Sequence, residues 1–100
     1  MKNKFYIFIF FRMEKVRFEG DAVIFSGATV IDCQGARRDI PELKMDWESV
    51  TSIGFRKGKG RCIISVNDIE FEYKVADEDA EQFKEKNYVK LDAKFDEKFN

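Results

Sequence analysis

Residues 61–75, RCIISVNDIEFEYKV, decide the fold of this chain. Two runs of strand-forming residues within the stretch are separated only by Asn67 and Asp68, and both of these residue types tolerate positive φ. The spacing predicts a β-hairpin with a type I′ turn, in which Val66 lies opposite Ile69.

In that register one face of the hairpin is apolar and the other is mostly wet. The side chains that point inward are Cys62, Ile64, Val66, Phe71 and Tyr73. The outward face places Ser65 opposite Glu70 and Ile63 opposite Glu72, as expected for a half-buried antiparallel pair. A shift of one residue would bury both glutamates and Lys74, so the pattern determines the register well.

The chain before the hairpin is predicted to supply more strands. Residues 15–33 alternate as two or three short strands, with a turn at Gly20 and a break at Gly27. Residues 34–44 form the least regular part, and Pro41 argues against a central strand there.

Two further segments complete the predicted fold. Residues 47–55 (WESVTSIGF) are rich in β-branched and aromatic side chains, which predicts a strand. Residues 76–87 change to helical spacing and begin with acidic side chains, which a helix N-terminus favours. The sequence therefore predicts one α+β domain, a strongly bent antiparallel β-sheet or open β-barrel closed by a C-terminal α-helix. Its core is residues 15–88, with an apolar strand or extension at 1–12 and a helical tail at 89–100.

The composition and charge of the chain limit the classes of function it can have. The 100 residues are 44% hydrophobic and 37% charged, with a net charge of −1, so the chain as a whole is not a polyelectrolyte binder. Residues 1–61 carry 12 basic and 8 acidic side chains, whereas residues 62–100 carry 6 and 11. This asymmetry either reflects the packing of the two halves or orients a charged partner.

The residue types that most enzymes need are missing or unpaired. Histidine is absent, which removes most zinc ligand sets and every Ser-His-Asp or Cys-His arrangement. Cys33 and Cys62 form no CxxC pair, and the inward position of Cys62 predicts a buried thiol. Glu70 and Glu72 share a strand face but are expected to lie on an ordinary wet surface. We therefore expect no catalysis, no metal and no cofactor.

The N-terminus carries a short apolar run, FYIFIFF, after two lysines. Seven residues are too few for a membrane span, and no small-residue cleavage site follows, so a cytoplasmic protein is expected. Three readings stay open: a core strand, an edge strand that pairs with a second copy or another protein, or an extension upstream of a start at Met13. The candidate partner-binding residues here are Phe5, Ile7, Ile9 and Phe11.

An aromatic stripe continues past residue 87. Its members, at spacings of three and four, are Tyr88, Leu91, Phe95 and Phe99. Relative to Ala80 and Phe83 the stripe drifts around the helix, so either one long helix turns its apolar side from the sheet or a break occurs near Lys86-Asn87. The stripe is a candidate docking surface, or it packs back on residues 5–11.

The segment FRKGKGR holds the densest positive charge. Arg56, Lys57, Lys59 and Arg61 alternate with two glycines, and such a loop could grip phosphate through charge and backbone N–H groups. The alternative is a solvated loop. The GxxxxGK[ST] phosphate-binding motif is absent.

The order of these elements resembles that of small bacterial pleckstrin-homology-like domains. The residues that carry the resemblance are Ile40-Pro41, Trp47, Val50, Ile53, the hairpin 61–75 and the helix from Asp77. It covers roughly residues 15–88 and implies a bent barrel plugged by a helix, in modules that bind lipids, peptides or proteins. Lipid-binding members usually carry basic residues in the first hairpin loop, where this chain has the acidic Glu19-Gly20-Asp21.

Three hypotheses for function follow. The first is a non-catalytic protein-interaction module that binds a protein partner or itself, as a homodimer, through the N-terminal strand and the C-terminal stripe. The second is a module that binds phosphate, a lipid head group or nucleic acid through residues 56–61. The third is a small inhibitor encoded by a phage or mobile element, which the Lys-, Phe- and Asn-rich composition allows.

Overall fold

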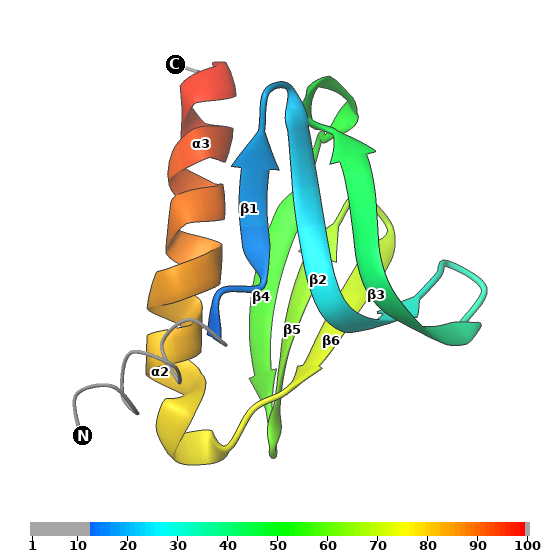
Figure 1. Ribbon diagram of the computed structural model, residues 1–100, viewed down its shortest axis with the longest axis vertical. Helices are drawn as coiled ribbons and strands as arrows, with labels where there is room; N and C mark the ends of the chain where they lie inside the picture. Colours follow the sequence, from blue (N-terminus) through cyan, green and yellow to red (C-terminus); the bar gives the residue numbers. More distant parts are fainter. Residues whose placement is uncertain (1–12, 100) are drawn as a thin grey trace.

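Six strands form a single curled antiparallel sheet that the C-terminal helix closes (Figure 1). The computed structural model describes residues 13–99. The strands are β1 (Val16–Glu19), β2 (Ala22–Ile31), β3 (Arg37–Asp46), β4 (Ile53–Gly58), β5 (Arg61–Val66) and β6 (Ile69–Lys74). The result is a half-barrel with a helix across its open side, and it confirms the predicted α+β fold.

Strand β2 holds the two halves of the sheet together. The strand order is β1-β2-β6-β5-β4, and β3 pairs with β2 along the opposite edge. Along the first edge, β2 pairs with β1 up to Phe25 and with β6 only from Thr29 to Ile31. Gly27 lies between these two pairings with a φ of +65°. The predicted break at this glycine is therefore wrong, because the strand continues through it and changes partner.

The central hairpin has the predicted register. Val66 lies opposite Ile69, Ile64 opposite Phe71 and Cys62 opposite Tyr73, and the inward side chains are buried.

Two details of the hairpin differ from the prediction. Only Asn67 has a positive φ, of 55°, whereas a type I′ turn needs two such residues. Ile63 is buried although it points to the outer face. Its cross-strand neighbours are Arg56 and Glu72, and Glu72 forms ion pairs with Arg37 and Arg61 on this face.

Two segments before the hairpin differ from the prediction. Residues 34–44 are not irregular, because β3 occupies most of them; Pro41 is accepted there since β3 is paired only with β2. Residues 47–55 are not one strand. Trp47–Ser49 forms a 3-10 turn, η1, which begins where the Asp46 side chain accepts a hydrogen bond from Glu48 N at 3.3 Å. Strand β4 starts only after this turn.

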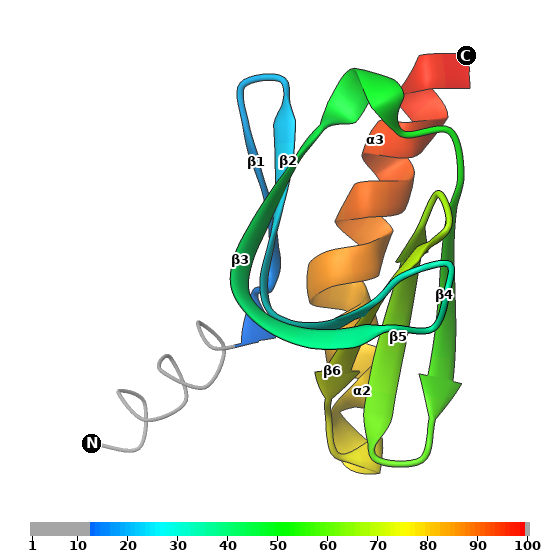
Figure 2. The same ribbon diagram turned by 90° about the vertical axis from the view of Figure 1, so that its right-hand side faces the viewer.

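A helical segment follows β6 and runs to residue 99 without a break. It consists of a 3-10 turn η2 (Asp77–Asp79), α2 (Ala80–Phe83), a π-helical turn η3 (Lys84–Tyr88) and α3 (Val89–Phe99). The π-turn resolves the predicted drift of the apolar stripe. Residues five apart align in a π-turn, so Tyr88 comes back onto the face that carries Phe83. Figure 2 shows this helix lying behind β4, β5 and β6.

The core lies between the helix and the inner face of the sheet. Phe25 of β2 stacks on Phe71 of β6 with ring centroids 4.0 Å apart, and Tyr73 packs on Phe83 of the helix at 5.1 Å. Leu91 is fully buried in the same cluster. Each such side chain contributes about 1.5–3 kcal/mol by leaving water, so the helix is an integral part of the domain.

Candidate functional site

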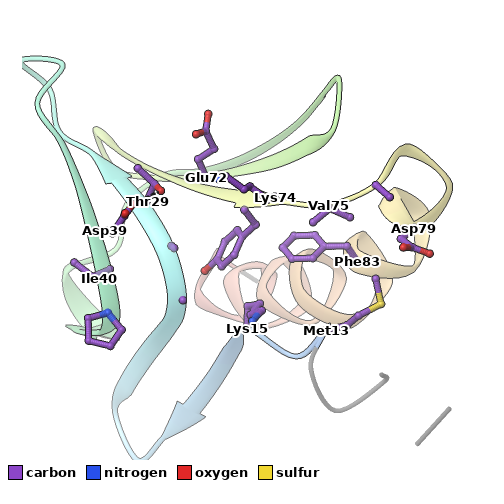
Figure 3. A pocket seen from close by; sticks show the side chains of 15 residues that line it. Met13, Lys15, Thr29, Asp39, Ile40, Glu72, Lys74, Val75, Asp79 and Phe83 are labelled. Carbon is purple, nitrogen blue, oxygen red and sulfur yellow. Dashed lines mark hydrogen bonds between the residues drawn. The ribbon is translucent and has the colours of Figure 1, made fainter. Parts of the chain in front are cut away.

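The wall of the half-barrel is open where β1 and β6 part along β2. A cavity of about 600 Å³ occupies this opening (Figure 3). We name it the groove; its apolar lining includes Met13, Ala28, Ile40, Tyr73, Val75 and Phe83. Its volume falls within the range of about 300–1,000 Å³ typical of ligand sites, and its lining of apolar groups with a few polar ones is also typical.

The pairing of β2 explains why the groove exists. Val75 N donates at 3.0 Å to the carbonyl oxygen of Gly60, the residue just before β5, so the peptide groups of Val75 face the β5 side. Because N–H groups of a strand alternate in direction, those of Lys74 face the side of β2. The pairing of β6 with β2 ends at Thr29 and Glu72, two residues before Lys74. Among the described residues, a short unpaired strand edge therefore borders the groove.

Asn87, which the sequence analysis did not single out, fixes one rim of the groove. Its side chain is fully buried in the π-turn. Oδ1 accepts from Lys15 N at 2.6 Å and Val16 N at 3.0 Å, while Nδ2 donates to Met13 O at 2.7 Å and Phe83 O at 3.0 Å. All four hydrogen-bonding positions of the amide are used, and they attach the start of β1 to the helix. The sequence signal that could have identified it is an asparagine four residues from both Phe83 and Leu91, on the buried face of the helix.

Tyr73 brings an unpartnered hydroxyl to the groove. The residue is 2% exposed, and its Oη makes no hydrogen bond within the described part of the chain. Desolvation by burial raises the pKa of this phenol well above its ordinary value, so it stays protonated across the physiological range. A buried polar group without a partner costs about 1–3 kcal/mol, and such groups are rare in native proteins.

Charged side chains surround the mouth of the groove, and most carboxylates among them are already engaged. Glu72 pairs with Arg37 at 2.6 Å and Arg61 at 3.5 Å. Asp39 accepts from Thr29 Oγ1 at 2.6 Å. These contacts neutralise or occupy both acidic groups on the sheet side of the opening.

The predicted basic loop is a tight hairpin. Arg56 and Lys57 belong to β4 and Arg61 to β5, so only Lys59 and Gly60 form the turn. The two glycines do not lengthen the loop, because the strands pair up to Gly58 and Arg61.

Several groups of this hairpin already have partners. Arg56 bonds both oxygens of Glu70, at 2.6 and 3.3 Å, and thereby lowers the pKa of that carboxyl. Gly60 N donates to Asp77 Oδ1 at 2.9 Å, which occupies one of the N–H groups that phosphate would use. Anion binding by the four cations stays a prediction, and the structure adds no support to it.

The C-terminal stripe packs mainly on the sheet. Leu91 is buried, the Tyr88 ring lies 5.4 Å from that of Phe55, and the Phe95 ring 6.4 Å from that of Trp47. Only Phe99 is largely exposed, at 64%. Among the four stripe residues, Phe99 is therefore the aromatic most open to a partner, and docking through the stripe stays a prediction. The other predicted partner-binding residues, Phe5, Ile7, Ile9 and Phe11, lie outside the described residues.

Within residues 13–99, neither the cysteines nor the possible metal-ligating side chains form a second candidate site. Cys62 is buried as predicted, burial raises its pKa, and both it and the exposed Cys33 are free. Within residues 13–99 no group of three His, Cys, Asp or Glu side chains is placed to hold a metal ion. No helix in this part of the chain combines the length and apolar composition needed to cross a membrane.

Comparison of the chain with protein-family models, with curated proteins and with solved structures finds no match. The resemblance to pleckstrin-homology-like domains therefore stays a prediction beyond the coarse fold.

Proposed function

We propose that this protein is a non-catalytic protein-interaction module whose binding site is the groove. The observation that carries the proposal is the opening itself, an apolar cavity of about 600 Å³ between β1 and β6. A folded domain normally fills such a gap with its own side chains. Within residues 13–99 no side chain fills this opening, and it lies beside an unpaired strand edge, as a receptor for an extended apolar segment of another protein needs.

Two features favour a protein segment as the occupant. The peptide groups of Lys74 face the opening beyond the last pair of β6 with β2, so they can pair with the main chain of an incoming segment. The wall beyond them is apolar, with Ile40, Val75 and Phe83 available for side chains. Main-chain pairing with adjacent apolar pockets is how strand-addition domains bind their partners.

A selection experiment with a matched pair of variants tests this function. Random octapeptides displayed with free C-termini are selected on the full chain, on Ala76→Phe and on Ala93→Phe. Ala76 is exposed at the groove, so a phenyl ring there obstructs the opening while leaving the core intact. Ala93 is exposed on α3, away from the groove, and controls for an added aromatic.

The proposal expects apolar sequences to be enriched on the native chain and on Ala93→Phe, and not on Ala76→Phe. Equal enrichment on all three proteins, or on none, would show that the groove is not the binding site. Self-association through residues 5–11 is a separate prediction and has its own test below.

A further inference from the structure

The described part of the chain begins at the groove. Met13 lines it, and Figure 3 shows this residue beside Phe83 and Asp79 at one end of the cavity. The main chain is held at this point, because Met13 O accepts a hydrogen bond from the buried side chain of Asn87 at 2.7 Å. The residues before Met13 therefore join the folded domain at the rim of the groove.

The nearest upstream segment is the apolar run FYIFIFF, residues 5–11. Only Arg12 separates it from Met13, and consecutive Cα atoms are about 3.8 Å apart, so the Cα of Phe11 lies within about 8 Å of that of Met13. An apolar run that would otherwise meet water is thus tethered beside an apolar cavity. Its aromatic and β-branched residues favour an extended backbone, which can supply the main-chain partner that the edge at Lys74 lacks.

Charge also matches the segment to the groove. Residues 1–12 carry three basic side chains and no Asp or Glu. Residues 77–81, where the helical segment starts, carry four acidic side chains and no basic one. Asp79 of this group lines the groove at the end where Met13 lies, and Arg12 is attached directly to Met13. Opposite charges therefore flank the apolar run and the end of the cavity nearest to it.

The tether favours the same chain over a second copy as the source of the segment. A short flexible linker that spans two sites gives a local concentration in the millimolar range. The span is met here because Met13 itself lines the groove. At protein concentrations well below that range, the groove meets the run of its own chain far more often than that of another molecule.

We propose that residues 5–11 occupy the groove of their own chain and that a partner segment must displace them to bind. The inference rests on the proposed function, because it adds autoinhibition to the site that this function assigns. Without a partner, the run covers the apolar lining and pairs with the edge at Lys74. A partner then binds with an affinity reduced in proportion to the fraction of molecules whose groove is open.

Hydrogen exchange of the full chain tests the occupancy. Amides of residues 5–11 are followed by NMR in the native chain, in Ala76→Phe and in the control Ala93→Phe. In the native chain and in Ala93→Phe, the most protected of these amides should exchange at least about tenfold more slowly than in an unstructured chain. In Ala76→Phe, whose added ring obstructs the groove, they should exchange at the unstructured rate.

Three results of this experiment would overturn the inference. Equal protection in all three proteins would show that the run packs outside the groove. Absence of protection in all three would show that it is unbound. Protection that increases with protein concentration would assign the groove to the run of a second copy.

A further variant links occupancy to binding. Ile7→Ser combined with Ile9→Ser removes apolar groups from the run and leaves residues 13–99 unchanged. A synthetic peptide with the sequence of residues 1–12, MKNKFYIFIFFR, is titrated by calorimetry against this variant and the native chain. It should bind the variant at least about tenfold more tightly, and this gain should equal the slowing of exchange, because one closing equilibrium sets both. Val89→Ser, at an exposed apolar residue of α3, is the control and should bind like the native chain.

The outcomes separate this inference from the function on which it rests. If octapeptides are enriched through the groove while residues 5–11 exchange freely, the groove binds partners and the autoinhibition is wrong. If residues 5–11 are protected except in Ala76→Phe and no octapeptide is enriched, the run is the occupant and the proposed function fails. Equal affinity of the synthetic peptide for the native chain and the double variant, or no binding to either, would refute displacement.

Discussion

Replacing Asn87 by Ala should greatly destabilise the domain. The variant removes four hydrogen bonds, and it leaves Lys15 N, Val16 N and the carbonyls of Met13 and Phe83 without their partner at a buried site. At about 0.5–1.5 kcal/mol net for each of the four bonds, the loss is about 2–6 kcal/mol. That is a large part of the roughly 5–15 kcal/mol expected for a domain of this size.

Urea denaturation, followed by fluorescence of the buried Trp47, measures the effect. With a slope of about 1–3 kcal/mol per molar urea, the transition midpoint should fall by at least about 0.7 M. Lys90→Ala is the control on the same helix. It removes an exposed ion pair with Glu14, at 3.3 Å, and should change stability by less than about 1 kcal/mol.

Asn87→Asp separates the loss of donors from the loss of volume. The introduced carboxylate keeps the acceptor for β1 but faces the carbonyl of Met13, which the amide contacts at 2.7 Å. Burial and this repulsion favour the neutral acid in the folded state, so the folded pKa is raised. The variant should therefore be most stable below the unfolded pKa of about 3.9 and lose stability as pH rises through the folded pKa. If the urea midpoint of Asn87→Ala matched that of Lys90→Ala, the proposed role of Asn87 in attaching β1 to the helix would be refuted.

Three further results are expected. In the native protein a thiol reagent should modify the exposed Cys33 at once and the buried Cys62 only on unfolding; equal rates would contradict the fold. Burial raises the pKa of Tyr73, so the phenol stays protonated in the folded state, and the free energy of unfolding decreases as pH rises above the unfolded pKa of about 10. Between about pH 10 and 11 the native chain should therefore lose about 1 kcal/mol more than Tyr73→Phe, and parallel curves would disprove this. If residues 5–11 mediate self-association, deletion of residues 1–12 should lower the mass measured by light scattering, whereas an unchanged monomer mass before and after deletion would exclude it.

The sequence predicted the elements that local patterns determine. In the hairpin, a period of two with glutamates on alternate positions allows one register, and that register is confirmed. The closing helix was predicted from a change of period that begins after β6, and it too is confirmed.

The errors arose where tertiary context overrides local preference. Strand β3 was missed because it is largely exposed, so charged residues and Pro41 occupy positions that would be apolar in a central strand. Trp47 favours a strand, but hydrogen bonds to the side chain and carbonyl of Asp46 turn the chain at residues 47–49. Neither effect is visible in the spacing of apolar residues.

The groove could not be predicted because it depends on pairings far apart in the chain. It exists because β2 changes partner near Gly27, and that change depends on where β6, some 45 residues later, meets it. The unpartnered hydroxyl of Tyr73 could not be predicted either. Tyr73 was correctly assigned to the core, but nothing in the sequence showed that its hydroxyl would lack a partner.

The most direct test of the account is to map where a bound peptide contacts the protein. The amide resonances of the isotope-labelled full chain are followed during titration with a peptide enriched in the selection on the native chain. The account predicts that the largest saturable shifts fall at residues 27–29, 73–76 and 83, which line the groove. Shifts concentrated instead at residues 56–61 or 95–99, with the groove unmoved, would contradict it.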